Sequence, residues 1–582
     1  MIKNIKMKRI TLIATIILIV AINNLYSQNV AKKLNPEYPV ENLTVHLSQK
    51  NIFSGEVIWF NIYCTSPLYP EIELSRMAYI ELTSSENAAL LREKIILVKG
   101  VGKGEFIVPK NTPTGIYSIK AYTKWMKNFG NENMFKTTVT IINPDKEFDY
   151  QINEEENAEL IGLDKSKERN IVPPLKVNLE KQVYATREKV MIKIESTLLS
   201  DLSPGGSYSI AVSRKEPLLH SIVKSNIPGV VHEKPMALTF LPDYKGIVLF
   251  GNITNPSGEP VGGEQVILSY PGSGTDVNSS KTDLNGNFNF LLQPKEGEKD
   301  IVFTLPKTNL KLRLDEPFWN EYEEDSKTDN ILLLDKNALS FLKERYSHFQ
   351  LQKKFKQQYF EKRIQPELDE NQDWVFYGSP EQMLELNKYV KLDSITEYFW
   401  ELIPSVKFLR KRDGFDIQII NPATYFPFEE SPAVFVDGVL YPNFNEIADI
   451  PVENLRQIAV IPDVYYYRDF SFGGIVDIHT NENDFNSVEL LPQMQRVLYP
   501  LGTLTEAMYK APDYSDNKLQ KRIPDLRYLI YWNPDIEIND SGESYVEFYT
   551  SDIEGEYEVK VVGISNDGNI HQSENKIIVN AR

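Results

Sequence analysis

The chain of 582 residues is poor in the residue types on which most metal and redox sites depend. It has one cysteine, Cys64, and six histidines. A single cysteine excludes an internal disulfide framework, a CxxC redox pair and a thiolate zinc site. The chain also has no basic excess, because 63 Lys and Arg stand against 81 Asp and Glu, for a net charge of −18. Since phosphate binding needs a basic surface, we expect no nucleic-acid partner.

Long apolar runs are missing after the first residues of the chain. The N-terminal run, Ile10–Ile22, follows a segment with four Lys and Arg residues and precedes polar residues up to Gln28. This order predicts a cleaved signal peptide over 1–28, with an uncleaved anchor as the alternative, because a spanning helix needs ~20 apolar residues. No lipobox cysteine stands at the expected cleavage region. We therefore expect an exported protein that is peripheral to a membrane.

Aromatic residues are abundant, with 31 Tyr and 28 Phe, which favours strands. Apolar–polar alternation between Gly, Pro and Asn turns predicts antiparallel sandwiches, and helical spacing predicts a helix over 338–362 and short helices at 379–386 and 394–402. The expected fold is mainly β: Ig-like sandwiches in a multidomain chain, with a helical segment and a small α/β domain. The expected boundaries are 35–145, 171–243, 244–315, 316–403 (an acidic linker with the helical segment), 404–482 and 510–582.

Two segments carry resemblances to known β domains. Phe53-Ser-Gly-Glu56, Thr114–Phe129 and Ile142-Asn-Pro144 make residues 53–144 similar to the macroglobulin-type sandwich of alpha-2-macroglobulin-like proteins, and 171–243 resembles a second such domain more weakly. The cysteine of the macroglobulin thioester sequence is missing from Gly262-Gly-Glu-Gln265, so covalent trapping is not implied.

Residues 244–315 resemble the carboxypeptidase regulatory-like domain, a small transthyretin-like sandwich. Pro256–Val261 and Thr282-Asp-Leu-Asn-Gly-Asn-Phe288 carry this resemblance. In that family the module is an accessory to the hydrolase, so no peptidase activity is implied.

Residues 404–482 resemble the plug domain of TonB-dependent outer-membrane receptors. The matching segments are Pro432-Ala-Val-Phe-Val-Asp-Gly438, Ile450–Ile461 and Phe472–Thr480. A receptor barrel needs on the order of 20 strands of 9–11 residues, and only 100 residues follow Glu482, so the plug has no barrel in this chain. The domain order and the segment Asp525–Pro534 resemble exported multidomain proteins of Bacteroidetes. This resemblance implies a periplasmic protein associated with the outer membrane.

Catalytic motifs are few. The sequence contains no Gly-x-Ser-x-Gly elbow, His-Glu-x-x-His or Walker loop. His479-Thr-Asn-Glu482 has the spacing of two carboxypeptidase-type zinc ligands, for which His571, His348 or His232 would have to supply the third ligand. The alternative is a surface histidine at a strand end. We expect no cofactor and no enzymatic activity.

The candidate partner contacts are aromatic residues and a turn. They are Tyr465, Tyr466, Tyr467 and Arg468; Asp437 and Gly438; and Tyr531 and Trp532. Tyr and Arg often anchor interfaces, but the tyrosine run is equally compatible with a packed domain edge, and Trp532 with a buried aromatic. The basic segment Lys343–Arg363 is interpreted as a contact for anionic lipid or an acidic partner, or as a solvated helix face.

These observations favour a non-enzymatic protein that docks on an outer-membrane barrel, or on assembly, secretion or uptake machinery. Two alternatives stay open. One is a glycan- or peptide-binding component of an uptake system, and the other is a zinc metallopeptidase built around His479 and Glu482.

Overall fold

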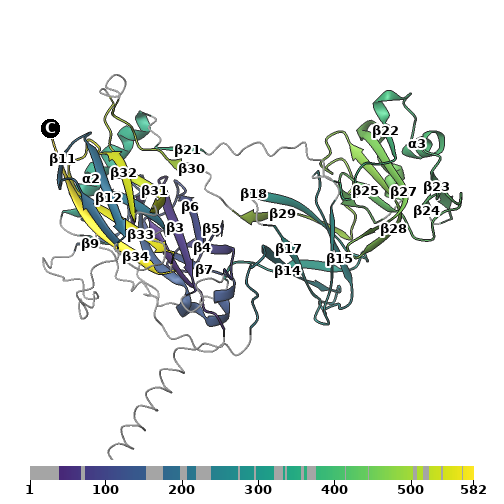
Figure 1. Cartoon of the computed structure of the whole chain (residues 1–582), viewed down its shortest axis with the longest axis horizontal. Helices are drawn as coiled ribbons and strands as arrows, with labels where there is room; N and C mark the ends of the chain where they lie inside the picture. Colours follow the sequence, from purple (N-terminus) through teal and green to yellow (C-terminus); the bar gives the residue numbers. More distant parts are fainter. Residues whose placement is uncertain are drawn as a thin grey trace, which may run out of the picture. The chain divides into compact units, whose positions relative to one another are not determined.

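The computed structural model forms two compact units and is mainly β, as expected (Figure 1). It describes residues 38–582 except 67–72, 153–174, 197–205, 218–237, 273–275, 294–296, 320–331, 335–336, 356–358, 363–374, 413, 443–444, 503–506, 516–522, 539–541 and 567. Unit 1 contains the described residues of 38–244, 319–362 and 507–582, and unit 2 those of 245–318 and 375–502. The expected signal peptide, 1–28, lies outside the described residues.

Unit 1 begins with a sandwich of two sheets. One sheet has the order β1-β3-β6 and the other β2-β8-β7-β4-β5. Long apolar strands form its core, with Ile58, Phe60 and Ile62 buried on the central strand β3. The bounds are β1 (Asn42–Leu47), β2 (Asn51–Phe53), β3 (Val57–Thr65), β4 (Met77–Thr83), β5 (Ala89–Ile96), β6 (Val101–Ile107), β7 (Gly115–Tyr122) and β8 (Phe135–Ile142), with 3₁₀ turns η1 (Trp125–Phe129) and η2 (Asn131–Asn133).

The second sandwich of unit 1 differs from the expected domain division. Segments 171–243 and 510–582 were expected to be separate sandwiches, but their strands share two sheets, β10-β12-β32 and β11-β34-β33-β13-β31. Strand β13 lies between β33 and β31. The bounds are β10 (Leu175–Leu179), β11 (Val183–Ala185), β12 (Lys189–Ser196), β13 (Gly206–Arg214), β31 (Leu529–Ile538), β32 (Glu543–Tyr549), β33 (Gly555–Ser565) and β34 (Ile570–Asn580).

Helix α2 (Ala338–Lys354) packs against both sandwiches of unit 1. Leu342 and Phe349 belong to one apolar cluster with Phe53 of the first sandwich, and Phe341 packs with Tyr528 beside the second. The expected helix reached residue 362, but α2 ends at Lys354, and Phe360–Lys362 is the short strand β21. Short strands complete the unit: β9 (Tyr150–Ile152) pairs with β20 (Leu332–Leu334), and β21 with β30 (Ala507–Tyr509).

Unit 2 combines a small sandwich with an α/β domain. The sandwich sheets are β17-β14-β19 and β16-β15-β18-β29, so its second sheet takes an edge strand from far along the chain. Strict alternation of buried residues on β14 and β17 gives the sandwich its core face. The bounds are β14 (Ile247–Thr254), β15 (Gln265–Ser269), β16 (Val277–Lys281), β17 (Asn287–Leu292), β18 (Gly297–Thr304), β19 (Lys311–Leu314) and β29 (Met494–Gly502).

The α/β domain has a five-stranded sheet, β22-β27-β28-β25-β26, beside a β23-β24 hairpin. Segment 379–386 was expected to be helical, but Gln382–Glu385 pairs with β27 as the edge strand β22, a correction to that prediction. Pairing with a neighbouring strand decides the structure of a stretch this short. The bounds are β22 (Gln382–Glu385), η3 (Leu386–Lys388), α3 (Ile395–Leu402), β23 (Val406–Lys411), β24 (Gly414–Ile419), β25 (Ala433–Val436), β26 (Val439–Leu440), η4 (Glu446–Asp449), η5 (Val452–Asn454), β27 (Leu455–Tyr467) and β28 (Phe470–Thr480).

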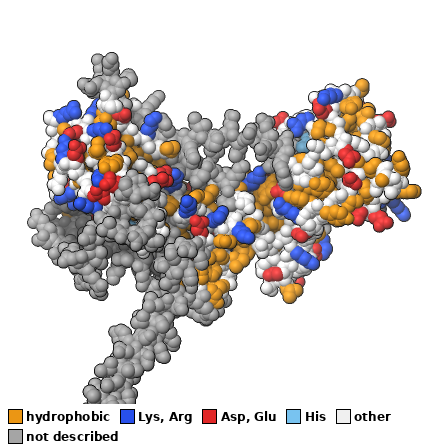
Figure 2. Space-filling model, viewed as in Figure 1, with side chains coloured by type: hydrophobic (Ala, Val, Ile, Leu, Met, Phe, Trp, Pro, Cys, Tyr) orange, Lys and Arg blue, Asp and Glu red, His pale blue; other side chains and the backbone are white. Residues whose placement is uncertain are grey.

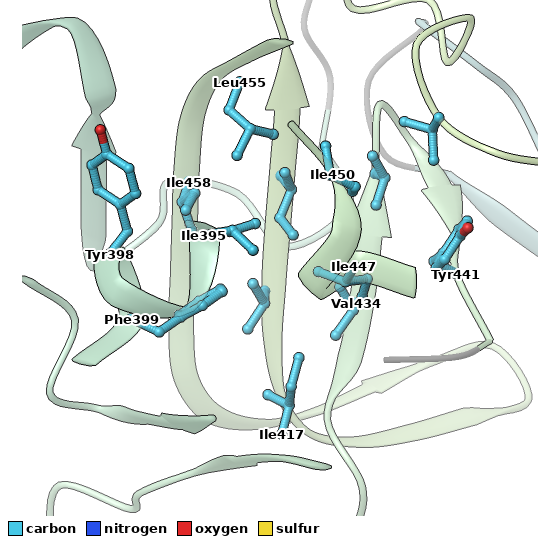
Figure 3. Close-up of a cluster of buried hydrophobic side chains, with 14 of the residues drawn as sticks. Ile395, Tyr398, Phe399, Ile417, Val434, Tyr441, Ile447, Ile450, Leu455 and Ile458 are labelled. Atoms are coloured by element: carbon cyan, nitrogen blue, oxygen red, sulfur yellow. The ribbon is translucent and has the colours of Figure 1, made fainter. Parts of the chain in front are cut away.

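One face of this sheet is covered by helix α3 and the 3₁₀ turn η4. Figure 3 shows Ile395 and Phe399 of α3, Ile447 of η4 and Ile458 of β27 pointing into one apolar cluster. The side chain of Ser394 accepts a hydrogen bond from the Glu397 backbone and starts α3. None of the described helices is long and apolar enough to cross a membrane.

Candidate interaction surface

The Asp437-Gly438 turn is a structural element of the α/β domain. Asp437 has φ 48° and Gly438 φ 82°, the left-handed pair that joins β25 to β26 in a tight hairpin. The Asp437 side chain is 1% exposed and accepts hydrogen bonds from the backbone N–H groups of Thr480 and Phe485 and from the Thr480 hydroxyl. A carboxylate used in this way holds the end of β28 and is not available to a partner.

His479 belongs to a buried polar network beside that turn. Its Nε2 lies 3.2 Å from Asp477 and its Nδ1 2.9 Å from the Asn483 side chain, while Tyr377 donates a hydrogen bond to Asp477. Burial lowers the pKa of His479, but the Asp477 carboxylate and Asn483 outweigh burial and raise this pKa to about 9. The imidazolium is therefore held as a hydrogen-bond donor on both nitrogens.

This network does not have the form of the zinc site that the His479–Glu482 spacing suggested. Both ring nitrogens of His479 are used, and the described residues contain no cluster of three or more His, Cys, Asp or Glu side chains that could hold a metal ion. His571 hydrogen-bonds Ser565, and His348 lies 3.1 Å from the Tyr528 hydroxyl. His232 lies outside the described residues.

In the run Tyr465–Arg468, three side chains make contacts within unit 2 and one, Tyr466, is exposed. Tyr465 donates to the Phe376 carbonyl, and Tyr467 stacks on the Phe376 ring at 4.2 Å and donates to Asp276. Arg468 reaches Asp276 at 3.4 Å and donates to the Val277 carbonyl. Tyr467 and Arg468 thus join the α/β domain to the small sandwich within unit 2. Tyr466 points to the other face of β27 and is 75% exposed.

Tyr531 and Trp532 are packing residues of unit 1. Trp532 is 4% exposed and packs with Trp59, Ala211 and Leu529, and Tyr531 stacks on Phe548. Trp532 is buried against neighbouring strands, and Tyr531 is half-buried. They do not form the exposed platform that a sugar ligand would need.

The basic segment Lys343–Arg363 contains a buried cation. Arg345 is 1% exposed, ion-paired with Glu56 and Glu216, and its guanidinium lies 4.5 Å from the centre of the Phe53 ring. Burial raises the pKa of Glu216 to about 7, although Arg345 opposes the shift. A buried guanidinium with two carboxylates fastens α2 between the sandwiches, so Arg345 cannot meet lipid or an acidic partner.

Tyr425 and Phe426, which the sequence analysis did not select, are among the most exposed aromatic residues described. They are 81% and 72% exposed, at the tip of a turn between β24 and β25. The Asn421 carbonyl accepts from the Tyr425 N–H, and the Asn421 N–H donates to the Phe426 carbonyl. Their position between Pro422 and Pro427 was the available signal, because prolines on both sides keep such a pair in a turn.

The turn and Tyr466 lie at the same end of the sheet. Strand β25 runs parallel to β28, so both strands begin at the same end of the sheet. The segment before β25, which carries Tyr425 and Phe426, therefore extends beyond that end. That end also carries the β27–β28 hairpin, where Tyr466 pairs with Ser471. The chain before β25 passes directly over Gly473, where an added Cβ would lie 2.1 Å from the Glu430 carbonyl. We call Tyr425, Phe426 and Tyr466 the aromatic surface.

Comparisons with known proteins identify no family for this chain. No family model matches it, and no curated relative matches it. Solved structures with similarity include alpha-2-macroglobulin of Salmonella reacted with methylamine (8% identity, 93% of this chain and 39% of that chain, TM-score 0.24) and trypsin-activated alpha-2-macroglobulin of Escherichia coli (10%, 94% and 42%, TM-score 0.24). The adhesin InvE of Yersinia pseudotuberculosis has 8% identity over 47% of this chain and 58% of that chain, with a TM-score of 0.13.

The chain therefore spans about two fifths of the length of the macroglobulins it resembles. TM-scores this far below 0.5 describe shared β architecture too loosely to carry an argument about function.

Proposed function

We propose that this protein acts by binding another protein, and that the aromatic surface of its α/β domain makes the contact. The observation that carries the proposal is the exposure of three large aromatic side chains, each more than 70% exposed, in segments at one end of the five-stranded sheet. Exposed apolar clusters mark interaction sites on soluble proteins, and tyrosines that become buried at an interface are frequent hot spots. Figure 2 shows hydrophobic side chains at the surface of the unit that carries α3 and β22–β28.

The aromatic surface is held in a defined shape before any partner arrives. Tyr425 has φ 61°, which costs a bulky residue on the order of 1 kcal/mol or more and persists only where the surroundings impose it. Here the backbone hydrogen bonds of Tyr425 and Phe426 to Asn421 hold Tyr425 in this conformation. On the hairpin, Tyr465 is fixed by the Phe376 carbonyl and Tyr467 by Asp276, on either side of Tyr466. Pre-ordering lowers the entropic cost of binding.

The partner in this proposal is an outer-membrane barrel protein or its associated machinery, met from the periplasm. Support comes from the resemblance of 404–482 to receptor plug domains and from the signal-peptide pattern of residues 1–28. The polar clusters support a binding role over catalysis, because Asp437, His479 and Arg345 are committed to internal hydrogen bonds and ion pairs. The glycan- or peptide-binding alternative, for which Tyr531 and Trp532 were one candidate contact, loses the support of Trp532, which is 4% exposed.

Crosslinked affinity purification from native envelopes tests the proposal. The tagged full-length chain, expressed at its natural level, should recover an outer-membrane barrel in stoichiometric amount. A variant with Tyr425→Ala, Phe426→Ala and Tyr466→Ala should lose the barrel, whereas Tyr545→Ala, which removes a 59% exposed tyrosine from unit 1, should retain it. Recovery of a monomer with no envelope partner would contradict the proposal.

A further inference from the structure

The aromatic surface has an acidic border. Within five residues of its members the chain has four exposed carboxylates, at Glu429, Glu430, Asp463 and Asp469. Asp469 accepts a hydrogen bond from Ser279 and so has a local partner. The same stretches contain one cation, Arg468, and its charge is shared with Asp276. The stretches that carry the exposed rings therefore have a net negative charge.

From this arrangement we infer that the occupant of the aromatic surface is a protein recess that is apolar at its centre and bordered by Lys and Arg. This inference deepens the proposed function and rests on it. The rings of Tyr425, Phe426 and Tyr466 would fill the recess, and the carboxylates would face its basic border. Complementary charges at an interface border accelerate association and fix orientation.

Two other occupants fit this surface less well. An anionic membrane surface would be repelled by the carboxylates, which outnumber the cations in the stretches that carry the rings. A second copy of this chain, using the same surface, would bring two acidic borders together about a two-fold axis, and like charges in such a contact cost several kcal/mol. A basic, apolar recess on a different protein satisfies both the rings and the carboxylates.

Photocrosslinking in the full-length chain tests this inference. A photoreactive phenylalanine derivative is placed at position 466 in one strain and at position 545, on the exposed face of β32, in a control strain. After irradiation of native envelopes, the crosslinked segment is identified by mass spectrometry. We expect position 466 to capture one protein, through a segment in which apolar residues are flanked by Lys or Arg, and position 545 not to capture it.

Charge variants then separate the inference from the proposed function. Glu429→Gln with Glu430→Gln and Asp463→Asn should lower capture at position 466 by about fivefold or more, and raising salt from about 50 to about 500 mM should have a similar effect. The matched control is Glu453→Gln with Glu482→Gln, two exposed acids at the opposite end of β27 and β28, which should leave capture unchanged.

Each other outcome has a definite meaning. Capture of a protein that is insensitive to salt and to the charge variants would overturn the acidic-border inference and leave the proposed function standing. Crosslinks to lipid or to a second copy of this chain would overturn the inference in favour of those occupants. Absence of any crosslink at position 466 would overturn both the inference and the proposed function.

Discussion

The two units solve the same problem, joining two substructures, by different means. In unit 1 a buried ion cluster lies beside apolar contacts between the two sandwiches, among them Trp59 with Trp532. Arg345 pairs with Glu56 and Glu216 beneath α2, and a second buried pair, Asp525 with Arg527, lies at the start of the second sandwich. In unit 2 the α/β domain contacts the small sandwich through Tyr467 and Arg468, which bind Asp276, beside an aromatic cluster of Phe376 with Tyr465, Tyr467 and Phe472.

The difference extends to what each unit exposes. Among the described residues, the aromatic side chains that are more than 70% exposed all lie in unit 2, at Tyr425, Phe426 and Tyr466. The exposed Tyr545 of unit 1 lies on a sheet face where Lys193 bridges Glu195 and Glu543. Unit 1 therefore combines buried ion pairs with no ring more than 70% exposed among its described residues, and unit 2 combines an aromatic cluster with three such rings.

Removing the central cation should produce the largest change, confined to unit 1. Arg345→Ala leaves Glu56 and Glu216 near each other without their counter-charge, and breaking a buried pair from one side costs about 3–5 kcal/mol. We expect this loss in the unfolding free energy of unit 1, measured by hydrogen exchange of β2 and β13 in denaturant. Lys343→Ala, at an exposed position of the same helix, is the control, and an equal effect of both variants would refute the role given to Arg345.

Truncating Phe376, at the centre of the aromatic cluster, should lower the free energy of unfolding of unit 2 by about 3 kcal/mol. Phe376→Ala removes a buried ring that stacks on Tyr467 at 4.2 Å and packs against Phe435. Hydrogen exchange should report faster opening of β16 and of the β27–β28 hairpin, with unit 1 unchanged. Equally faster exchange in both units would show that the stability of unit 1 depends on the aromatic cluster of unit 2.

The pH dependence should distinguish the units on the alkaline side. The pKa of His479 is raised to about 9 in the folded state, from 6.5 in an unfolded chain. Its contribution to unit 2 is therefore complete below pH 6.5 and is lost as the pH rises through 9, on the order of 3 kcal/mol. Denaturant unfolding of unit 2 between pH 6 and pH 10, followed for the wild type and His479→Gln, measures the effect. A variant with the same alkaline loss as the wild type would contradict this assignment.

The smallest expected effect is local to α3. Ser394→Ala removes the side-chain acceptor for the Glu397 N–H and should cost about 1 kcal/mol in unit 2. Ser394→Asp keeps an acceptor and should retain wild-type stability. Thermal unfolding of both variants provides the comparison, and equal loss in Ser394→Asp would argue against capping as the cause.

Local patterns predicted much of the fold. The mainly β fold that alternation predicted was confirmed, and β1 to β8 all lie within the segment 35–145 expected to form the first sandwich. The Asp437-Gly438 pair predicted a tight turn, and Ser394 predicted the start of a helix. Both features could be predicted because turns and helix starts depend on neighbouring residues. The sharing of strands between 171–243 and 510–582 could not be predicted, since pairing partners more than 300 residues apart leave no local signature.

Candidate contacts were harder to predict than strands. The period of two along β27 places Tyr465 and Tyr467 on one face and Tyr466 on the other, so alternation could have separated them. Which face is covered depends on Phe376, nearly 90 residues earlier in the chain. Arg345 resembles its basic neighbours in sequence, and only the folded positions of Glu56 and Glu216 account for its burial.

The central claim is that binding resides in unit 2, at the aromatic surface. Hydrogen exchange of the full-length chain, alone and with the barrel protein recovered from envelopes, tests it most directly. The account predicts slower exchange on binding at residues 421–431 and 464–472, with the sheets of unit 1 unchanged. Protection in unit 1, with exchange at the aromatic surface unaltered, would contradict it.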